Sequence, residues 1–305
     1  MFTLAHISDV HLAPLPPGAA WRRFKLKRLV GYISWRFNRR DLHDAAVAGV
    51  IAADLLAAEP EHIAVTGDVV NIAAREEFAQ AAAWLRKLGP AKDVSFVPGN
   101  HDTYVPVPWE NHLALLSPLM QGDMNIALSQ RTRQIDTPFP YVRLRKNVAL
   151  IGLSTAVPQT FDRAGGTLGD TQLQSLAGLL RDLRERGYAR VVMIHHPPLP
   201  GLAPAAKALT DAAALRRIVE DEGAELMIHG HNHRVMVNSF DTRYGAAHVI
   251  GVPSASMRAV VGHTPAAWHK FEIQRQDGRW HIAVTARGLQ IDGSVETVSE
   301  FNLLS

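Results

Sequence analysis

The sequence predicts an α/β protein in which two sheets share one domain and helices cover their outer faces. Strand-like and helical segments alternate over the first hundred residues, an order typical of parallel strands joined by right-handed crossovers. After residue 234 the strand-like runs follow one another without helices between them. The 305 residues are enough for one large core, so we expect a single domain over residues 1–305.

The first half of the chain supplies the clearest alternation of elements. Apolar, β-branched runs predict strands, and Ala-rich or amphipathic runs ended by Pro60 and by Gly89-Pro90 predict helices. The expected elements are a strand at 3–8, a helix at 44–58, a strand at 62–66, a helix at 75–88 and a strand at 94–97.

The second half begins with a proline-rich, irregular stretch. Residues 103–139 contain one helical run at 109–120 and are interpreted as a cap-like insertion. An antiparallel pair at 141–144 and 148–153 turns at Lys146-Asn147, and residues 288–305 give no clear signal. The remaining expected elements are helices at 170–187 and 211–221 and strands at 190–194, 225–228, 235–240, 246–250, 267–273 and 280–286.

Composition limits the possible functions. Apolar residues make up 47% of the chain and charged residues 20%, which is ordinary for a globular protein without a membrane-spanning segment. With no cysteine, any metal must be held by nitrogen and oxygen ligands. A net charge of +3 does not indicate a nucleic-acid polymer as partner. Because the first strand starts at the first residue, we expect no signal peptide and a cytoplasmic location.

Residues 21–40 form the most distinctive stretch outside the motifs. Apolar residues recur on one face of a helix, at Leu26, Leu29, Val30, Ile33 and Phe37. The basic residues have no acid among them: Arg22, Arg23, Lys25, Lys27, Arg28, Arg36, Arg39 and Arg40. A basic amphipathic insertion over residues 14–40 is typical of proteins at an anionic membrane surface. The alternatives are a helix packed on its own domain with a solvated basic face, and a site for an anionic substrate.

Polar side chains follow five of the predicted strands. They provide two carboxylates, one amide oxygen and four imidazoles, at Asp9, His11, Asp68, Asn100, His195, His231 and His233. In such sheets ligands bind at the carboxyl ends of the strands, where these residues fall. Seven donors suit two metal ions better than one. Asp68 is the expected bridge, because a carboxylate offers two charged oxygens. Asp9 and His11, two residues apart on an extended segment, are expected to share one face.

This donor set indicates phosphoester hydrolysis. Two cations ~3.5–4 Å apart can hold a water, lower its pKa and aim it at phosphorus. The leaving oxygen then needs a proton, and His101 follows Asn100 without being needed as a ligand. Its ordinary pKa suits a general acid at neutral pH. Asp102 is expected to orient the His101 ring.

The order Asp-x-His, Gly-Asp-x-x-Asn, Gly-Asn-His-Asp, His and Gly-His-x-His resembles the calcineurin-like metallophosphoesterase superfamily. The resemblance implies a four-layer αββα sandwich, the metallo-dependent phosphatase fold, with two mixed sheets flanked by helices. It also implies a dinuclear centre of manganese, iron or zinc. By motif, the ligands of one metal are Asp9, His11, Asp68 and His233, and those of the other are Asp68, Asn100, His195 and His231. His101 matches the residue that protonates the leaving group.

Within the superfamily, the Gly-Asn-His-Asp block is most similar to the bacterial class III cyclic nucleotide phosphodiesterase and glycerophosphodiesterase branch. The basic insertion resembles instead the membrane-associated members that cleave the pyrophosphate of a UDP-linked acylated glucosamine, or a related phospholipid. Peripheral attachment to the inner membrane surface therefore stays open. A phosphomonoesterase is the main rival, while a non-catalytic binding protein is disfavoured because no ligand is missing. A single-zinc hydrolase would leave four strand-end residues unexplained. The sequence does not indicate the oligomeric state.

Overall fold

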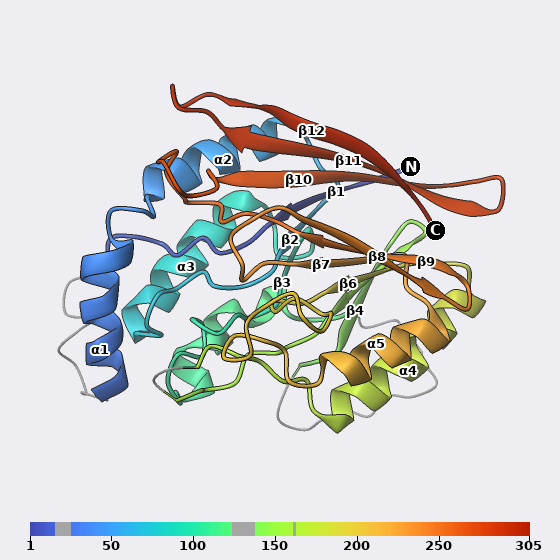
Figure 1. Cartoon of the computed structure of the whole chain (residues 1–305), viewed down its shortest axis with the longest axis horizontal. Coiled ribbons are helices and arrows are strands. Elements are labelled where there is room, and N and C mark those ends of the chain that lie inside the picture. The colour runs from blue at the N-terminus through green and yellow to red at the C-terminus, as the bar shows by residue number, and fades with distance from the viewer. Residues whose placement is uncertain (16–25, 124–137, 161–162) are drawn as a thin grey trace.

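Two six-stranded sheets face each other in the computed structural model, with α-helices on their outer sides (Figure 1). The structure describes residues 1–15, 26–123, 138–160 and 163–305. Each sheet contains both parallel and antiparallel neighbours. The predicted fold class, two mixed sheets flanked by helices, is confirmed.

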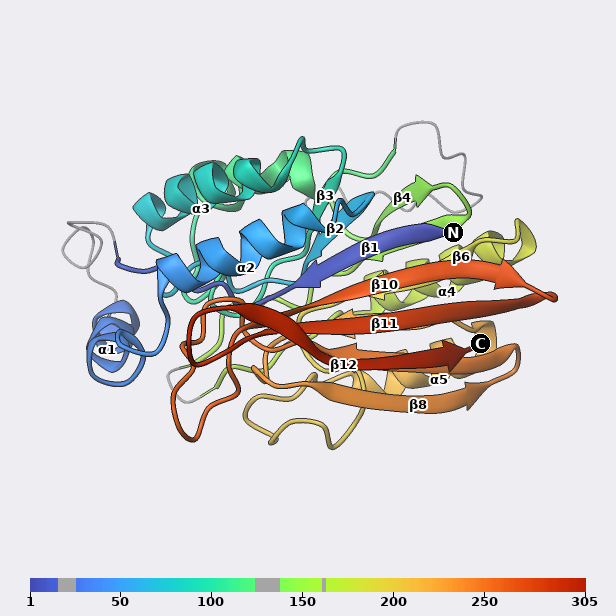
Figure 2. The ribbon, with the colours of Figure 1, turned by 90° about the horizontal axis from the view of Figure 1, so that it is seen from above.

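The first sheet joins the start of the chain to its end. Its strand order is β12-β11-β10-β1-β2-β3, and β1 pairs with β2 in parallel and with β10 in antiparallel orientation. Helices α2 (Ala45–Ala57) and α3 (Arg75–Leu88) lie side by side when the molecule is seen from above (Figure 2). The strands are β1 (Phe2–Ile7), β2 (His62–Val65), β3 (Val94–Phe96), β10 (Ala267–Gln276), β11 (Arg279–Leu289) and β12 (Val295–Leu304).

The second sheet is built from the middle of the chain. Its strand order is β4-β5-β6-β7-β9-β8, with α4 (Asp170–Glu185) and α5 (Ala212–Glu222) packed against each other on its outer side (Figure 1). The strands are β4 (Tyr141–Arg145), β5 (Val148–Gly152), β6 (Ala189–Met193), β7 (Leu226–His229), β8 (Met236–Thr242) and β9 (Gly245–Gly251).

Apolar side chains from both sheets meet in one buried cluster. Leu4 and Phe271 come from the first sheet, and Val191 and Ile228 come from the second. A further cluster, which includes Leu176, lies between the second sheet and its helices. The two sheets are held together by this burial, which removes apolar surface from water. Because β1, β2 and β3 are parallel neighbours, as are β6 and β7, and because His195 after β6 contacts Asn100 after β3, the loops that follow these strands meet at one edge of the sandwich.

Three segments differ from the sequence-based expectations. The helix expected over residues 21–40 is α1 (Leu26–Ser34) followed by a π-helical turn at Trp35–Arg39, and residues 16–25 lie outside the described residues. The helix expected at 109–120 is two 3-10 helices, Trp109–Asn111 and Leu113–Leu119, the second of which contains Pro118. Part of the expected cap-like insertion, at 124–137, is likewise outside the described residues. Residues 295–304 form the edge strand β12, whose largely exposed side chains give little sequence signal.

Candidate metal centre

The predicted donors occupy loops whose backbones are bonded to one another. Asp9 N donates to Gly67 O at 2.9 Å and His11 N donates to Asp68 O at 2.9 Å, which joins the loop after β1 to the loop after β2. Five of the seven donors have φ between 42° and 70°, in the left-handed region that residues with a Cβ rarely adopt: Asp9, His11, Asp68, His231 and His233. Strain of this kind is typical of functional sites, because the surrounding structure must stabilise it.

One group of donors surrounds Asp9. The Nε2 atom of His233 lies 3.2 Å from Oδ1 of Asp9 and 3.3 Å from Nε2 of His11. The distance from His11 Nε2 to Asp9 Oδ1 is 3.9 Å. Asp9 and His11 are not on an extended segment as expected, since both have positive φ, but they do converge.

A second group of donors surrounds Asn100. The Nε2 atom of His195 lies 3.2 Å from Oδ1 of Asn100, and Nδ1 of His231 lies 2.9 Å from the same oxygen. His195 Nδ1 donates to the Thr66 carbonyl at 2.6 Å, which leaves Nε2 to face Asn100. This is the usual way in which a protein orients a metal-binding histidine.

Asp68 lies between the two groups. Its Oδ2 atom is 3.3 Å from His195 Nε2 and 4.0 Å from His11 Nε2. Its Oδ1 atom accepts a hydrogen bond from His101 N at 2.7 Å. One oxygen of Asp68 is therefore held by the protein, while the other faces both groups of donors.

The chemistry of these atoms fits a pair of metal ions. Among the described residues, Asp9 Oδ1 and His231 Nε2 are buried and have no hydrogen-bond partner. In the part of the chain that the structure describes, four groups of three place possible ligand atoms within 4.8 Å of one another: Asp9–Asp68–His195, His11–Asp68–His101, His11–His43–His233 and His195–His196–His231. Imidazole and carboxylate ligands suit first-row transition metals such as zinc, iron and manganese. The family's dinuclear centre is thus compatible with this donor set.

Burial and nearby charges oppose each other in this site. Burial raises the pKa of Asp9, but positive charge on His233 and His195 outweighs it and holds that pKa well below its ordinary value. Burial lowers the pKa of His195, but the Asp68 carboxylate outweighs it and raises that pKa to about 9. The carboxylates are thus kept ionised, which is the form that binds cations.

His101 lies beside the donors. Its Nδ1 donates to the Asn71 carbonyl at 2.6 Å. Its ring is 4.9 Å from the ring of His11 and stacks on Tyr104. This placement is compatible with the predicted general acid.

Asp102 does not take the predicted role in the contacts that the structure describes. One of its oxygens accepts from the amides of Gly99 and Asp68 at 2.8 Å, and the other accepts from Val69 and Val70 at 3.0 and 3.2 Å. Burial, together with the neighbouring Asp68 charge, raises the pKa of Asp102 to about 7. Asp102 therefore joins the loops that carry Asp68 and Asn100 instead of orienting the His101 ring.

Sequence comparison decides the family. Residues 2–235 match the family model of the calcineurin-like phosphoesterases, and this match covers more than half of the chain. The chain belongs to this family. No curated protein matches it in sequence.

Solved structures support the same fold at low sequence identity. A dimetal phosphatase from Danio rerio has a TM-score of 0.63 and 16% identity, with 98% of each chain covered. A purple acid phosphatase from yellow lupin (Lupinus luteus) seeds has a TM-score of 0.59 and 11% identity, with 99% of this chain and 53% of that chain covered. The sulfate thiohydrolase SoxB of Thermus thermophilus has a TM-score of 0.51 and 16% identity, with 99% of this chain and 56% of that chain covered.

A cavity of about 260 Å³ lies beside the candidate donors, and its lining includes Lys27 of the basic insertion and three residues that the sequence analysis did not select, Tyr104, Arg163 and Lys207. Asn100 and His101 line it together with Lys27, Tyr104, Arg163 and Lys207. These side chains come from separate parts of the chain, so no local pattern could have grouped them. The positive charges of Lys27, Arg163 and Lys207 suit a substrate that carries phosphate.

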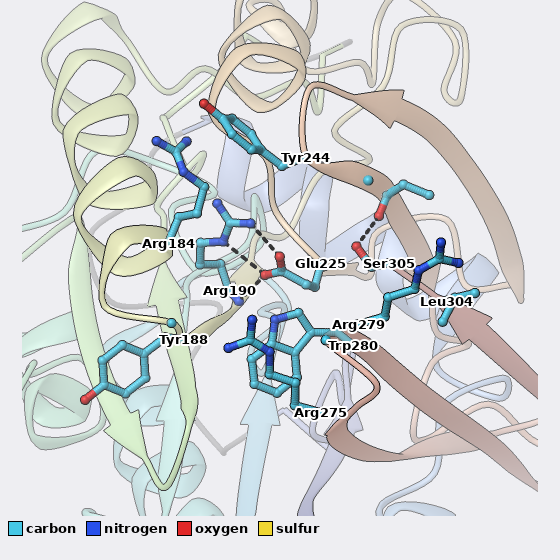
Figure 3. A pocket seen from close by; sticks show the side chains of 14 residues that line it. Arg184, Tyr188, Arg190, Glu225, Tyr244, Arg275, Arg279, Trp280, Leu304 and Ser305 are labelled. Carbon is cyan, nitrogen blue, oxygen red and sulfur yellow. Dashed lines mark hydrogen bonds and ion pairs between the residues drawn. The ribbon is translucent and has the colours of Figure 1, made fainter.

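A larger cavity, of about 460 Å³, lies elsewhere in the protein (Figure 3). It is lined by residues that precede or begin β6 and β7, including Arg190 and Glu225, and by the β10–β11 turn. Arg190 and Glu225 form a buried ion pair there, with Nε and Oε2 3.0 Å apart. The predicted donors are at the opposite ends of these strands, so this cavity is not the metal centre.

Proposed function

We propose that the protein hydrolyses a phosphodiester or a pyrophosphate at a dinuclear metal centre, with His101 as the general acid. The observation that carries this proposal is the position of Asp68 Oδ2, which faces His195 and His11 from between two groups of donors. A site for one ion would not need a carboxylate oxygen directed at both groups. The proposed ligands are Asp9, His11, Asp68 and His233 on one side and Asp68, Asn100, His195 and His231 on the other.

In this proposal the metals, the general acid and the basic residues of the cavity have separate roles. Two bound metals, for which manganese, iron and zinc are the candidates, would supply an activated water and neutralise charge on the phosphoryl oxygens. His101 would deliver the proton from Nε2 to the leaving oxygen, since its Nδ1 is held by Asn71 O. Lys27, Arg163 and Lys207 would bind further negative charge on the substrate, because they line the same cavity as His101.

An anionic membrane surface is the proposed location of a lipid-linked substrate. Helix α1 and the π-helical turn after it expose the apolar residues Val30, Ile33 and Phe37, whose exposed fractions are 43%, 47% and 80%. The other side of α1 is attached to the domain, where Lys27 donates to the carbonyls of Tyr104 and Gln159, each at 2.7 Å. An apolar face next to basic side chains fits an anionic bilayer. The substrate would then be a UDP-acylglucosamine pyrophosphate or a phospholipid.

Cosedimentation with anionic liposomes tests this surface. A variant with Ile33→Ser and Phe37→Ser should bind such liposomes less than the wild type, while Val237→Ser, an exposed apolar residue on β8, should bind equally. Equal binding by the double variant would contradict the proposal. No described helix is both long and apolar enough to cross a bilayer. The cytoplasmic location remains a prediction.

A substrate panel tests the function itself. The purified protein with added Mn²⁺ should hydrolyse bis-p-nitrophenyl phosphate faster than p-nitrophenyl phosphate, since the first is a diester and the second the rival monoester. The panel then compares cyclic nucleotides, glycerophosphodiesters and a UDP-linked acylated sugar in detergent. Absence of turnover with every first-row metal would refute the proposal, and preference for the monoester would favour a phosphomonoesterase.

A further inference from the structure

His43 lies against the Asp9 group, although no motif contains it. Its ring is 4.7 Å from the ring of His11 and 5.4 Å from the ring of His233, measured between centroids. His11, His43 and His233 each offer a ring nitrogen within 4.8 Å of the others. His43 is only 3% exposed, so its imidazole is buried beside these rings and is not a solvated surface group.

The backbone around His43 is held against the loop that follows β9. His43 forms an antiparallel bridge with Met257, and Asp44 N donates to Ser256 O at 3.0 Å. Arg258 N donates to Leu42 O at 2.9 Å on the other side of the bridge. This segment directly follows the π-helical turn, so the basic insertion ends at the metal centre.

Hydrogen bonds fix the orientation of the imidazole. His43 Nδ1 lies 2.8 Å from Ser256 Oγ and 3.3 Å from Ser254 Oγ. Ser254 Oγ in turn donates to the backbone carbonyl of Asp9 at 2.6 Å. The same serine therefore contacts both His43 and a proposed ligand residue.

This arrangement repeats the one found at two proposed ligands. His11 Nδ1 donates to Val70 O at 3.3 Å, and His195 Nδ1 donates to Thr66 O at 2.6 Å. In each case Nδ1 is bonded to a protein oxygen, which is the usual way in which a protein orients a metal-binding histidine. His43 Nδ1 is likewise in contact with protein oxygens, those of Ser256 and Ser254, and Ser254 Oγ can accept from it because its own hydrogen is donated to Asp9 O.

We infer that His43 is an additional histidine ligand of the ion on the Asp9 side. The ion would then be held by three imidazoles, from His11, His43 and His233, besides the carboxylates of Asp9 and Asp68. A cation would accept the lone pairs of nitrogens that otherwise face one another, since His11 Nε2 and His233 Nε2 are only 3.3 Å apart. The inference rests on the proposed dinuclear centre and adds a ligand that the family motifs do not contain.

Metal binding by the full-length protein tests the inference without measuring activity. The wild type, His43→Gln and the matched control His62→Gln are freed of metal, titrated with Co²⁺ or Mn²⁺ against a competing chelator, and measured for bound metal. His62 is a suitable control because it is also buried and bonded to a serine, at 2.8 Å from Ser95 Oγ, but lies at the start of β2. Circular dichroism of each metal-free variant checks that it is folded.

We expect His43→Gln to bind one ion at least about tenfold more weakly and to retain the other, with a changed visible spectrum of the Co²⁺ form. His62→Gln should bind both ions like the wild type. Ser256→Ala should weaken the same ion to a smaller extent, because it removes only the bond that orients the ring; this variant also serves if His43→Gln does not fold. Two ions bound to His43→Gln with wild-type affinity and spectrum would overturn the inference. A wild type that binds fewer than two ions would instead refute the proposed function.

Discussion

The ring of Tyr104 lies almost parallel to the ring of His101, with centroids 5.6 Å apart and 8° between the planes. Tyr104 also contacts the basic insertion. The Lys27 ammonium lies 4.4 Å from the centre of its ring and donates to its carbonyl. Helix α1 is therefore connected to the proposed general acid through one aromatic side chain.

Gly31→Ala should lower kcat while both metals stay bound. A Cβ at this position would be 2.6 Å from a Tyr104 ring carbon, so the ring must move and His101 loses its support. We expect a loss of roughly tenfold, since small displacements of a catalytic group are costly. Gly49→Ala is the matched control because a Cβ there meets nothing within 4 Å. Wild-type kcat in Gly31→Ala would show that the Tyr104 contact does not affect catalysis.

His101→Ala should keep both metals and lose activity according to the leaving group. General acid catalysis contributes roughly 10²–10⁴-fold, and we expect a loss in this range for diesters with alkyl leaving groups. The loss should be smaller for a p-nitrophenyl diester, whose leaving group needs no proton. Steady-state kinetics on both substrates measures the two losses of activity, and metal analysis measures how many ions the variant binds. Empty metal sites in His101→Ala would assign the residue to metal binding instead.

Asp68→Ala should lose bound metal and activity together. Its Oδ2 faces both groups of donors, so the substitution removes a ligand from each proposed ion. Asn100→Ala should weaken mainly the ion on the side of His195 and His231, whose nitrogens lie at 3.2 and 2.9 Å from its Oδ1. Metal content measured by mass spectrometry checks both variants, with the exposed Asp241→Ala as control. Two ions retained by Asp68→Ala would exclude the bridging role.

Stability should decrease as the pH falls below about 6.5, in part because of His62. Burial, with the nearby Arg145 and Arg143 charges, lowers the pKa of His62 to about 2 in the folded protein. The unfolded chain takes up this proton near its ordinary pKa of about 6.5, so the stabilisation present above that pH is lost as the pH falls toward 2. The loss is about 1.4 kcal/mol per pH unit for this group.

Urea unfolding of the metal-free protein at pH 7 and pH 5 measures this effect. His62→Gln removes the titrating group, so its free energy of unfolding should fall less between the two pH values than that of the wild type. An equal fall in both proteins would mean that His62 is not kept neutral by the fold.

Glu225→Gln should destabilise the protein without changing the metal centre. The substitution leaves the buried guanidinium of Arg190 without its carboxylate, at the end of the sandwich shown in Figure 3. Breaking a buried ion pair from one side costs about 3–5 kcal/mol, measurable by denaturant unfolding. Metal content should match the wild type, and a loss of metal would indicate coupling between the two ends of the sheet.

Most of the helices and strands could be predicted from the sequence, because the apolar runs and helix-ending residues that indicate them lie within each element or next to it. The strand β1 follows from its apolar run, and the helices α2 and α3 follow from Ala-rich or amphipathic runs that end at Pro60 and at Gly89-Pro90. The same reasoning did not find β12, whose side chains are mostly exposed and which exists through its pairing with β11. It also gave one helix for the two 3-10 helices at 109–119, where Pro118 lacks the amide that a regular helix needs.

The sequence by itself determined which candidate donors the chain carries and that they follow strands, because residue type and strand propensity are local properties of the sequence. Only the tertiary structure decided what those donors contact. It directed Asp68 Oδ2 toward both groups, assigned Asp102 to four backbone amides and placed His43 beside His11. These contacts join residues far apart in the chain and depend on left-handed loop geometry, which the packing of two sheets imposes and no short motif encodes.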